Sequence, residues 1–157
     1  MVQGQFGEGD WFAVPLRQGG YAVGLLSRVN PRGVLAGYFF GPARLNVPTL
    51  VDVGGLTTAD AVLVGRFGHL GLIQGKWPLL GRLPDWDRSK WPMPTFLRYE
   101  ELCGRTFRVF YDDDDPNRVL REEQVIPGPS EQGPKDGLMG VGFVERALTR
   151  LASSGLS

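Results

Sequence analysis

The sequence contains one cysteine and one histidine, Cys103 and His69, and no excess of charge of either sign. A single cysteine excludes an internal disulfide framework, and one cysteine with one histidine cannot build the usual four-ligand structural zinc site. Seventeen basic residues balance seventeen acidic ones, so the basic surface that nucleic-acid binding usually requires is missing. We therefore expect no metal, no cofactor and no nucleic-acid partner.

Long apolar segments are missing as well. The longest uncharged run, residues 33–43, has eleven residues, whereas a helix needs about 20 to span a bilayer. The first ten residues lack the basic start and the apolar stretch of a secretory signal. We expect a cytoplasmic protein without membrane contact, and the lone cysteine fits a reducing compartment.

Glycine and proline are abundant instead, with 23 and 12 among 157 residues, where an average protein has about 12% of the two together. Frequent turns favour short strands over long helices. Segments rich in β-branched and aromatic residues predict a three-stranded meander over residues 10–16, 21–29 and 34–40. Gly24 and Gly37 lie inside two of these strands, and such glycines mark a bulge, a bend or a close backbone approach. We therefore predict a curved sheet.

Later strands are predicted at residues 61–67, 105–111 and 119–126. Apolar residues near the C-terminus recur at helical spacing: Phe143, Val144, Ala147, Leu148 and Leu151. We divide the chain into a β-rich domain (residues 1–126), a Gly/Pro linker (127–140) and a helix (141–154) that packs on the same domain. The predicted fold class is α+β and mainly β, with a strongly bent antiparallel sheet or partly open barrel under the C-terminal helix.

No motif in the sequence predicts catalysis. His69 has no serine or cysteine partner at a recognisable spacing, which favours a structural or surface role. Cys103 lacks the local signature of a catalytic thiol, so we interpret it as a small, semi-buried hydrophobic residue. A nucleophile elbow, a P-loop and a dinucleotide fingerprint are all absent. We assign no catalytic, cofactor-binding or metal-binding residue.

The most conspicuous polar feature is the run of four aspartates, Asp112, Asp113, Asp114 and Asp115. Calcium loops space their ligands two apart and include a glycine, and this run does neither. We favour a hairpin turn with solvated charges over a metal site. A third reading is a surface for a basic partner, because residues 99–123 hold eight acidic residues and four arginines. Such a patch would steer a cationic protein toward it.

The tryptophans offer two readings each. Trp77 precedes Pro78, which restricts it to extended backbone, and we favour a packed structural anchor. Trp86 and Trp91 flank a short charged segment. They are either structural anchors or exposed hot spots of an interface, since tryptophan dominates many such sites.

Five segments, taken in order and spacing, resemble the immunity protein 26 family of bacterial polymorphic toxin systems. They are Gly9-Asp10-Trp11-Phe12-Ala13-Val14-Pro15-Leu16, Gly20-Tyr21-Ala22-Val23-Gly24, Gly75-Lys76-Trp77-Pro78-Leu79-Leu80-Gly81, Pro94-Thr95-Phe96 and Tyr111-Asp112. The likeness extends from about Gly9 to Gln124. Within these segments we assign an architectural role to Gly9, Asp10, Pro15, Gly24, Trp77, Pro78 and Gly81.

The resemblance implies a protein that binds a cognate toxin in the cytoplasm of the producing cell and blocks it by occlusion, without catalysis. The same grouping carries the name of a small phosphotriesterase, and a hydrolase is therefore the second hypothesis, although one histidine leaves few metal ligands. A small-molecule or peptide-binding β module is the third. The predicted partner-binding residues are Asp112, Asp113, Asp114, Asp115, Glu122, Glu123, Trp86 and Trp91.

Overall fold

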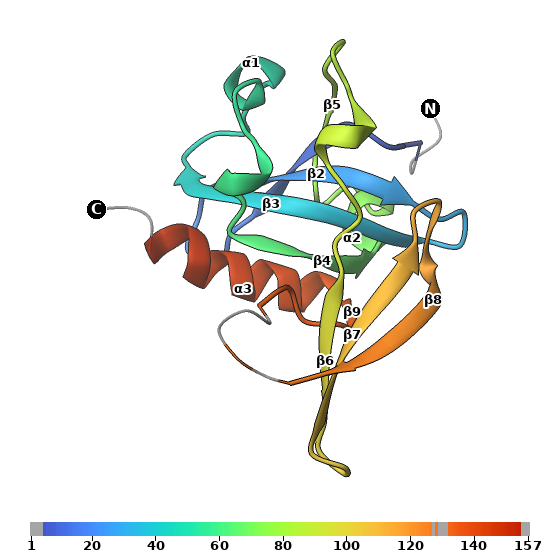
Figure 1. Cartoon of the computed structure of the whole chain (residues 1–157). Coiled ribbons are helices and arrows are strands. Elements are labelled where there is room, and N and C mark those ends of the chain that lie inside the picture. The colour runs from blue at the N-terminus through green and yellow to red at the C-terminus, as the bar shows by residue number, and fades with distance from the viewer. Residues whose placement is uncertain (1–4, 127, 129–131, 155–157) are drawn as a thin grey trace.

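The computed structural model describes residues 5–126, 128 and 132–154, and their strands form two open sheets (Figure 1). The six-stranded sheet has the spatial order β5 (Leu79–Arg82), β1 (Asp10–Pro15), β2 (Tyr21–Val29), β3 (Val34–Arg44), β4 (Leu63–Gly68) and β9 (Leu138–Met139). The three-stranded sheet has the order β6 (Phe96–Glu100), β7 (Arg105–Asp112) and β8 (Asp115–Val125). Only β4 and β9 pair in parallel among these strands.

Three α-helices accompany the sheets: α1 (Leu50–Val53), α2 (Leu70–Ile73) and α3 (Val141–Ser154). Two single 3-10 turns, η1 (Thr58–Asp60) and η2 (Arg88–Lys90), lie in the connections. The predicted meander corresponds to β1, β2 and β3, and the predicted late hairpin corresponds to β7 and β8. No helix among the described residues is long and apolar enough to cross a membrane.

One face of the six-stranded sheet is covered by α3 (Figure 1). The predicted helical stripe is largely confirmed, because Val144 and Leu148 are fully buried while Phe143 remains 51% exposed. A cluster of aromatic rings lies between the sheet and α3, and in it Phe12 and Trp77 stack with their planes 4° apart. The terminating Gly155 of the sequence prediction lies outside the described residues.

The opposite face of the same sheet is buried too. Side chains alternate across a strand, so Phe12 of β1 points toward α3 and Trp11 points to the other face. Trp11 packs there against Phe40 of β3 and Trp91 of the long connection between β5 and β6. Two buried faces explain why these strands are apolar almost throughout.

The sheet does not close, so the predicted strong bend or partly open barrel is wrong. The edge strands β5 and β9 stand at opposite ends of the strand order and contain only four and two residues. Gly24 makes room for a ring, since a Cβ there would lie 2.2 Å from Phe12. Gly37 allows a close backbone approach, since its Cβ would lie 2.4 Å from the Leu25 carbonyl oxygen. These glycines serve packing rather than closure.

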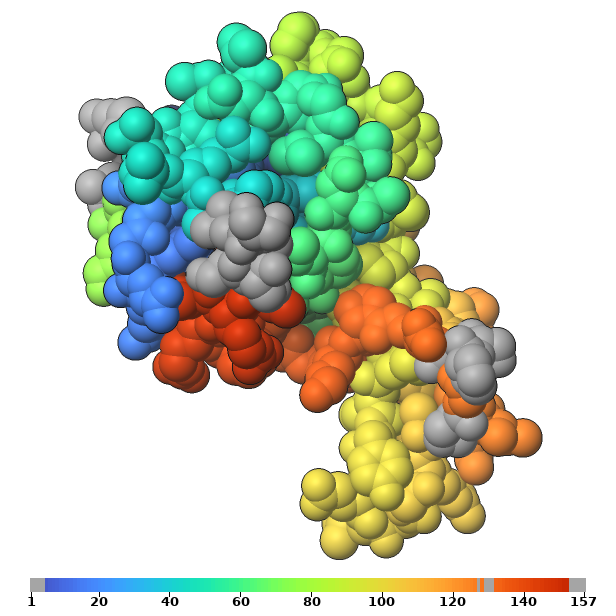
Figure 2. Space-filling model, turned by 90° about the vertical axis from the view of Figure 1, so that its left-hand side faces the viewer, coloured from blue at the N-terminus to red at the C-terminus, as the bar shows by residue number. Residues whose placement is uncertain are grey.

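The three-stranded sheet projects from the body of the molecule, and we call β6, β7 and β8 the arm (Figures 1 and 2). The arm has a small core of its own, formed by Phe96, Val109 and Tyr111 with Met93. At its far end the turn between β6 and β7 exposes Leu102 completely.

A short segment joins the arm to the body. The Leu97 N–H of β6 donates to the Pro134 carbonyl at 2.9 Å, and β9 follows a few residues later against β4. This segment falls within the predicted linker 127–140, of which residues 127 and 129–131 lie outside the described part of the chain.

Candidate functional site

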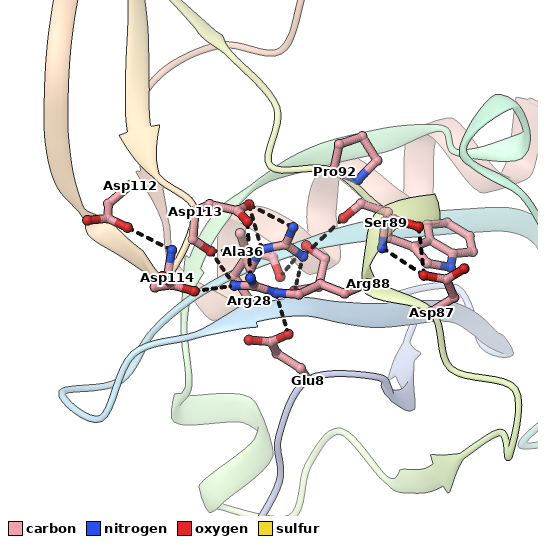
Figure 3. A network of polar contacts seen from close by, with 12 residues as sticks. Glu8, Arg28, Ala36, Asp87, Arg88, Ser89, Pro92, Asp112, Asp113 and Asp114 are labelled. Carbon is pink, nitrogen blue, oxygen red and sulfur yellow. Dashed lines mark hydrogen bonds and ion pairs between the residues drawn. The ribbon is translucent and has the colours of Figure 1, made fainter.

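The acidic run forms the turn between β7 and β8 and folds back onto the body (Figure 3). The Asp113 carboxylate accepts hydrogen bonds from Arg28 at 2.8 Å and 3.1 Å and from Arg88 at 3.1 Å. Arg28 belongs to β2 and Arg88 to η2. One aspartate of the arm thus connects two separate elements of the body.

Arg28 is the buried centre of this network, with a side chain only 3% exposed. A buried guanidinium must have its donors satisfied, because an unpaired charge in the interior is costly. In addition to the Asp113 carboxylate, Arg28 has two backbone acceptors. It donates to the Asp113 carbonyl at 2.9 Å and to the Trp91 carbonyl at 3.0 Å. Arg28 therefore holds the arm and the β5–β6 connection against the six-stranded sheet.

Arg88 extends the network toward the surface. It pairs with Glu8 at 2.9 Å and with Asp114 at 2.9 Å, in addition to Asp113. Asp115 accepts hydrogen bonds from the Asn117 backbone N–H and the Asn30 side chain, and these two contacts lower the pKa of Asp115. The predicted hairpin turn is confirmed, and the Asp113 and Asp114 side chains stay 58% and 83% exposed while they pair with these arginines.

Glu122 and Glu123 lie farther along β8, toward the outer end of the arm. Arg98 pairs with Glu122 at 2.6 Å, and this hydrogen bond lowers the pKa of Glu122. Arg121 pairs with Glu123 at 3.2 Å. Both carboxylates are partly exposed, yet each already has a basic neighbour, so the net negative field of this surface is weaker than the residue count alone indicates.

The structure gives different environments to Trp86 and Trp91, whose roles the sequence leaves undecided. Trp91 is only 8% exposed and packs edge-to-face against Trp11, Tyr38 and Phe40. Its reading as an exposed anchor is therefore wrong, because the ring is packed among other aromatic side chains in the interior.

Trp86 remains partly accessible. Its indole lies directly on the backbone of Gly9, where a Cβ would come within 2.8 Å of the ring. Gly9 has a φ of 90°, which also favours glycine. Trp86, Trp11 and Trp91 line a cleft of about 430 Å³, which we call the tryptophan cleft.

A second hollow, the apolar groove, has a volume of about 610 Å³. It lies between residues 61–64 at the start of β4, residues 133–140, and Phe143 of α3, on the face shown in Figure 2. The Asp136 carboxylate in its wall is already engaged, since it accepts a hydrogen bond from Tyr111 at 2.6 Å and pairs with Arg66 at 3.5 Å. The one carboxylate among the lining residues is thus used by the fold.

The remaining motif residues lie in the six-stranded sheet and its connections. The Trp77 indole N–H donates to Glu145 of α3 at 3.0 Å, and the Pro78 carbonyl accepts the Ala13 N–H at 2.8 Å. Asp10 accepts the Gly7 N–H at 2.7 Å. Pro15 lies opposite Tyr21 in the first hairpin, and Gly81 has a φ of 111°.

Neither His69 nor Cys103 has neighbours that indicate chemistry. The His69 ring lies under Gly33, where a Cβ would be 2.6 Å from Nε2, and edge-on to Phe6. Cys103 is exposed in the turn at the end of the arm, so its semi-buried interpretation is wrong. In the described ranges, no group of three or more His, Cys, Asp or Glu side chains could hold a metal ion.

Sequence reasoning missed the two buried arginines. Arg28 and Arg66 are 2% and 8% exposed, and Arg66 lies 4.2 Å over the Tyr111 ring. The available signal is a charged residue inside an otherwise apolar strand pattern. That signal does not name the partner, because Arg28 and Asp113 are 85 residues apart.

A known protein family matches the part of the chain that contains most of these elements. The family model described as immunity protein 26 matches residues 7–108, which include β1 to β6, Arg28 and the tryptophan cleft. The chain belongs to the immunity protein 26 family. Membership in this family implies an immunity role in a toxin system. The acidic turn, β8 and α3 of this immunity protein follow the matched segment. No curated protein and no solved structure matches the chain significantly.

Proposed function

We propose that this protein binds a cognate protein toxin and neutralises it by occluding the surface through which the toxin acts. The observation that carries the proposal is the family match over residues 7–108. Occlusion needs a preformed, rigid surface, because ordering a flexible one would subtract from the binding free energy. The doubly covered six-stranded sheet and the Arg28–Asp113 contact that fixes the arm supply such rigidity.

The proposed interface has an aromatic anchor and a charged rim. Trp86 is the anchor, since a partly exposed tryptophan held against Gly9 offers a large area at low entropic cost. The outward carboxylates of the arm, Asp114, Glu122 and Glu123, form the rim. Rim charges chiefly change the association rate rather than the lifetime of a complex. Asp113 and Asp115 act indirectly here, because they position the turn.

The test begins with the coding region beside the gene. A large reading frame that ends in a toxin domain should lie next to it, and expression of that domain alone should arrest bacterial growth. Co-expression of this protein should restore growth, and the two purified proteins should elute together in size-exclusion chromatography. Growth arrest that persists in spite of abundant folded protein, with no complex formed, would contradict the proposal.

Neither alternative gains specific support. A hydrolase would need clustered ligands or a nucleophile with its base, and the described residues offer no group of three metal-ligating side chains. If the protein is a binding module, the apolar groove offers contact area to a small molecule or a peptide. Its carboxylate Asp136 is bound to Tyr111 and Arg66, which leaves little to specify a ligand.

A further inference from the structure

The tryptophan cleft combines an aromatic floor with a charged mouth. Trp11 and Trp91 pack edge-to-face at 5.9 Å and form its inner end, while Trp86 is fixed on the Gly9 backbone at the rim. Its volume of about 430 Å³ lies within the range of pockets that hold an organic group. The cleft is therefore large enough for the end of a long side chain.

Carboxylates outnumber cations among the lining residues. Asp85 and Asp87 stand beside Trp86, and Lys90 is the cation of the lining. The Asp87 carboxylate is held in place by the Ser89 backbone N–H at 3.0 Å and the Ser89 hydroxyl at 2.7 Å (Figure 3). These two hydrogen bonds lower the pKa of Asp87 below its ordinary value.

The other wall of the cleft adds negative charge nearby. It is built by residues 53–58, between α1 and η1. Asp52 of α1 and Asp60 of η1 flank this segment in the chain, and Arg44 is the cation that acts on Asp52. Arg88, although next to Asp87 in the chain, turns away to Glu8, Asp113 and Asp114. Two carboxylates, Asp85 and Asp87, against one lysine, Lys90, leave the lining of the cleft with one net negative charge.

We propose that the tryptophan cleft receives a basic side chain, arginine or lysine, that the protein partner inserts between Trp86 and the Asp85–Asp87 pair. A cation is attracted to the face of an indole ring, and a carboxylate beside the ring adds a charge-assisted hydrogen bond. The inference rests on the proposed function for the source of the side chain. The chemistry of the cleft itself can be tested without a toxin.

The first experiment titrates the protein with two small probes of equal shape, N-acetyl-arginine amide and N-acetyl-citrulline amide. Binding is followed by NMR at the four indole N–H signals, with Trp86→Phe used to assign the Trp86 signal. The arginine probe should shift that signal saturably, and the uncharged citrulline probe should bind about tenfold more weakly. Equal binding of both probes, or no saturation by either, would refute a cation site.

Charge variants place the site within the cleft. Asp85→Asn with Asp87→Asn keeps the shape and the acceptor for Ser89, and should weaken the arginine probe about tenfold. Lys90→Gln should tighten it, because a competing cation is removed. The matched control, Glu100→Gln with Glu101→Gln at the outer end of the arm, removes the same charge elsewhere and should have no effect. An equal loss in this control would assign the binding to net charge and overturn the proposal.

Two further results distinguish a failure of the cleft proposal from a failure of the proposed function. Choline, a small free cation, should bind no better than the arginine probe, and tighter binding would identify a small molecule as the occupant instead. If the wild-type protein neutralises its toxin, the Asp85→Asn, Asp87→Asn variant should form a weaker complex, and an unchanged complex would overturn the proposal. Failure of the wild-type protein to neutralise any neighbouring toxin would contradict the proposed function, whereas the probe titration would still decide the cleft.

Discussion

The Arg28 guanidinium lies 2.8 Å from the Asp113 carboxylate, and this contact joins a buried strand to the turn at the base of the arm. Arg28 is almost fully buried, whereas the Asp113 side chain is 58% exposed. The contact therefore lies between a surface ion pair and a buried one in both setting and strength. It holds the arm at the β7–β8 turn, while Asp136, which pairs with Arg66 of β4 and Arg98 of β6, holds it farther along.

Asp113→Asn should lower the free energy of unfolding by about 1–2 kcal/mol, between the values typical of exposed and buried pairs. The loss follows because the buried Arg28 keeps its backbone acceptors and a neutral amide oxygen but loses its countercharge. Urea denaturation of the purified protein measures it. Asp114→Asn is the control, since that side chain is 83% exposed and should cost less than about 1 kcal/mol. Equal stability of the Asp113 variant and the wild type would contradict the structural role of the pair.

Gly24→Ala should destabilise the fold by about 1–3 kcal/mol, the usual cost of overpacking a core. The new Cβ would meet the ring of Phe12, which is fully buried and cannot move aside freely. Gly68→Ala is a matched control in β4, because nothing lies within 4 Å of its Cβ position and the change should stay within about 0.5 kcal/mol. Phe12→Leu should recover part of the loss when combined with Gly24→Ala, and strict additivity of the two changes would argue against a direct clash.

Tyr38→Phe should reduce the fall in folding stability that the protein shows at alkaline pH. Burial raises the pKa of Tyr38 from its ordinary value of 10.0 to about 12, against a smaller opposite effect of Arg28. Between these values the unfolded chain ionises Tyr38 and the folded protein does not, so stability falls as pH rises through this window. The phenolate absorbance should lose its step near pH 12 in the variant. Burial also raises the pKa of Tyr111, so a later step of its own remains in the variant. Tyr99→Phe on the exposed arm is the absorbance control, and an unchanged amplitude near pH 12 in Tyr38→Phe would contradict the assignment.

Asp114→Ser with Glu123→Gln should slow association with a basic toxin at low salt and have little effect at high salt. These carboxylates are exposed, so their field acts on the approaching partner and is screened by ions. Stopped-flow mixing at two ionic strengths measures the rates. Asp113 and Asp115 are left intact, because changing them would alter the turn as well as its charge. An association rate that does not respond to either substitution or salt would remove these residues from the rim.

The sequence predicts much of the fold because its strongest signals are local. The alternation in β7, the turn residues before Tyr21 and the helical spacing from Val144 to Leu148 each act within a few residues. The shape of the sheet is a different matter. Gly24 suits a bend and a ring contact equally well, and only the position of Phe12 on the neighbouring strand decides between them.

The candidate site was harder to predict, because its residues meet across long stretches of chain. Nothing local to Asp113 indicates Arg28, and nothing local to Trp91 indicates that Tyr38 and Phe40 enclose it. A run of charges is therefore a weak guide to an interface. The same residue types neutralise one another in the folded protein whenever a buried cation requires them.

The position of α3 in the chain has a consequence for biosynthesis. This helix covers Phe12, Phe39 and Phe67, yet it follows every strand that carries them. During synthesis this aromatic face stays uncovered until α3, which follows β9, has left the ribosome. Nascent chains with such a face are prone to aggregate or to recruit chaperones, and a stall before residue 141 would leave a product without this helical cover.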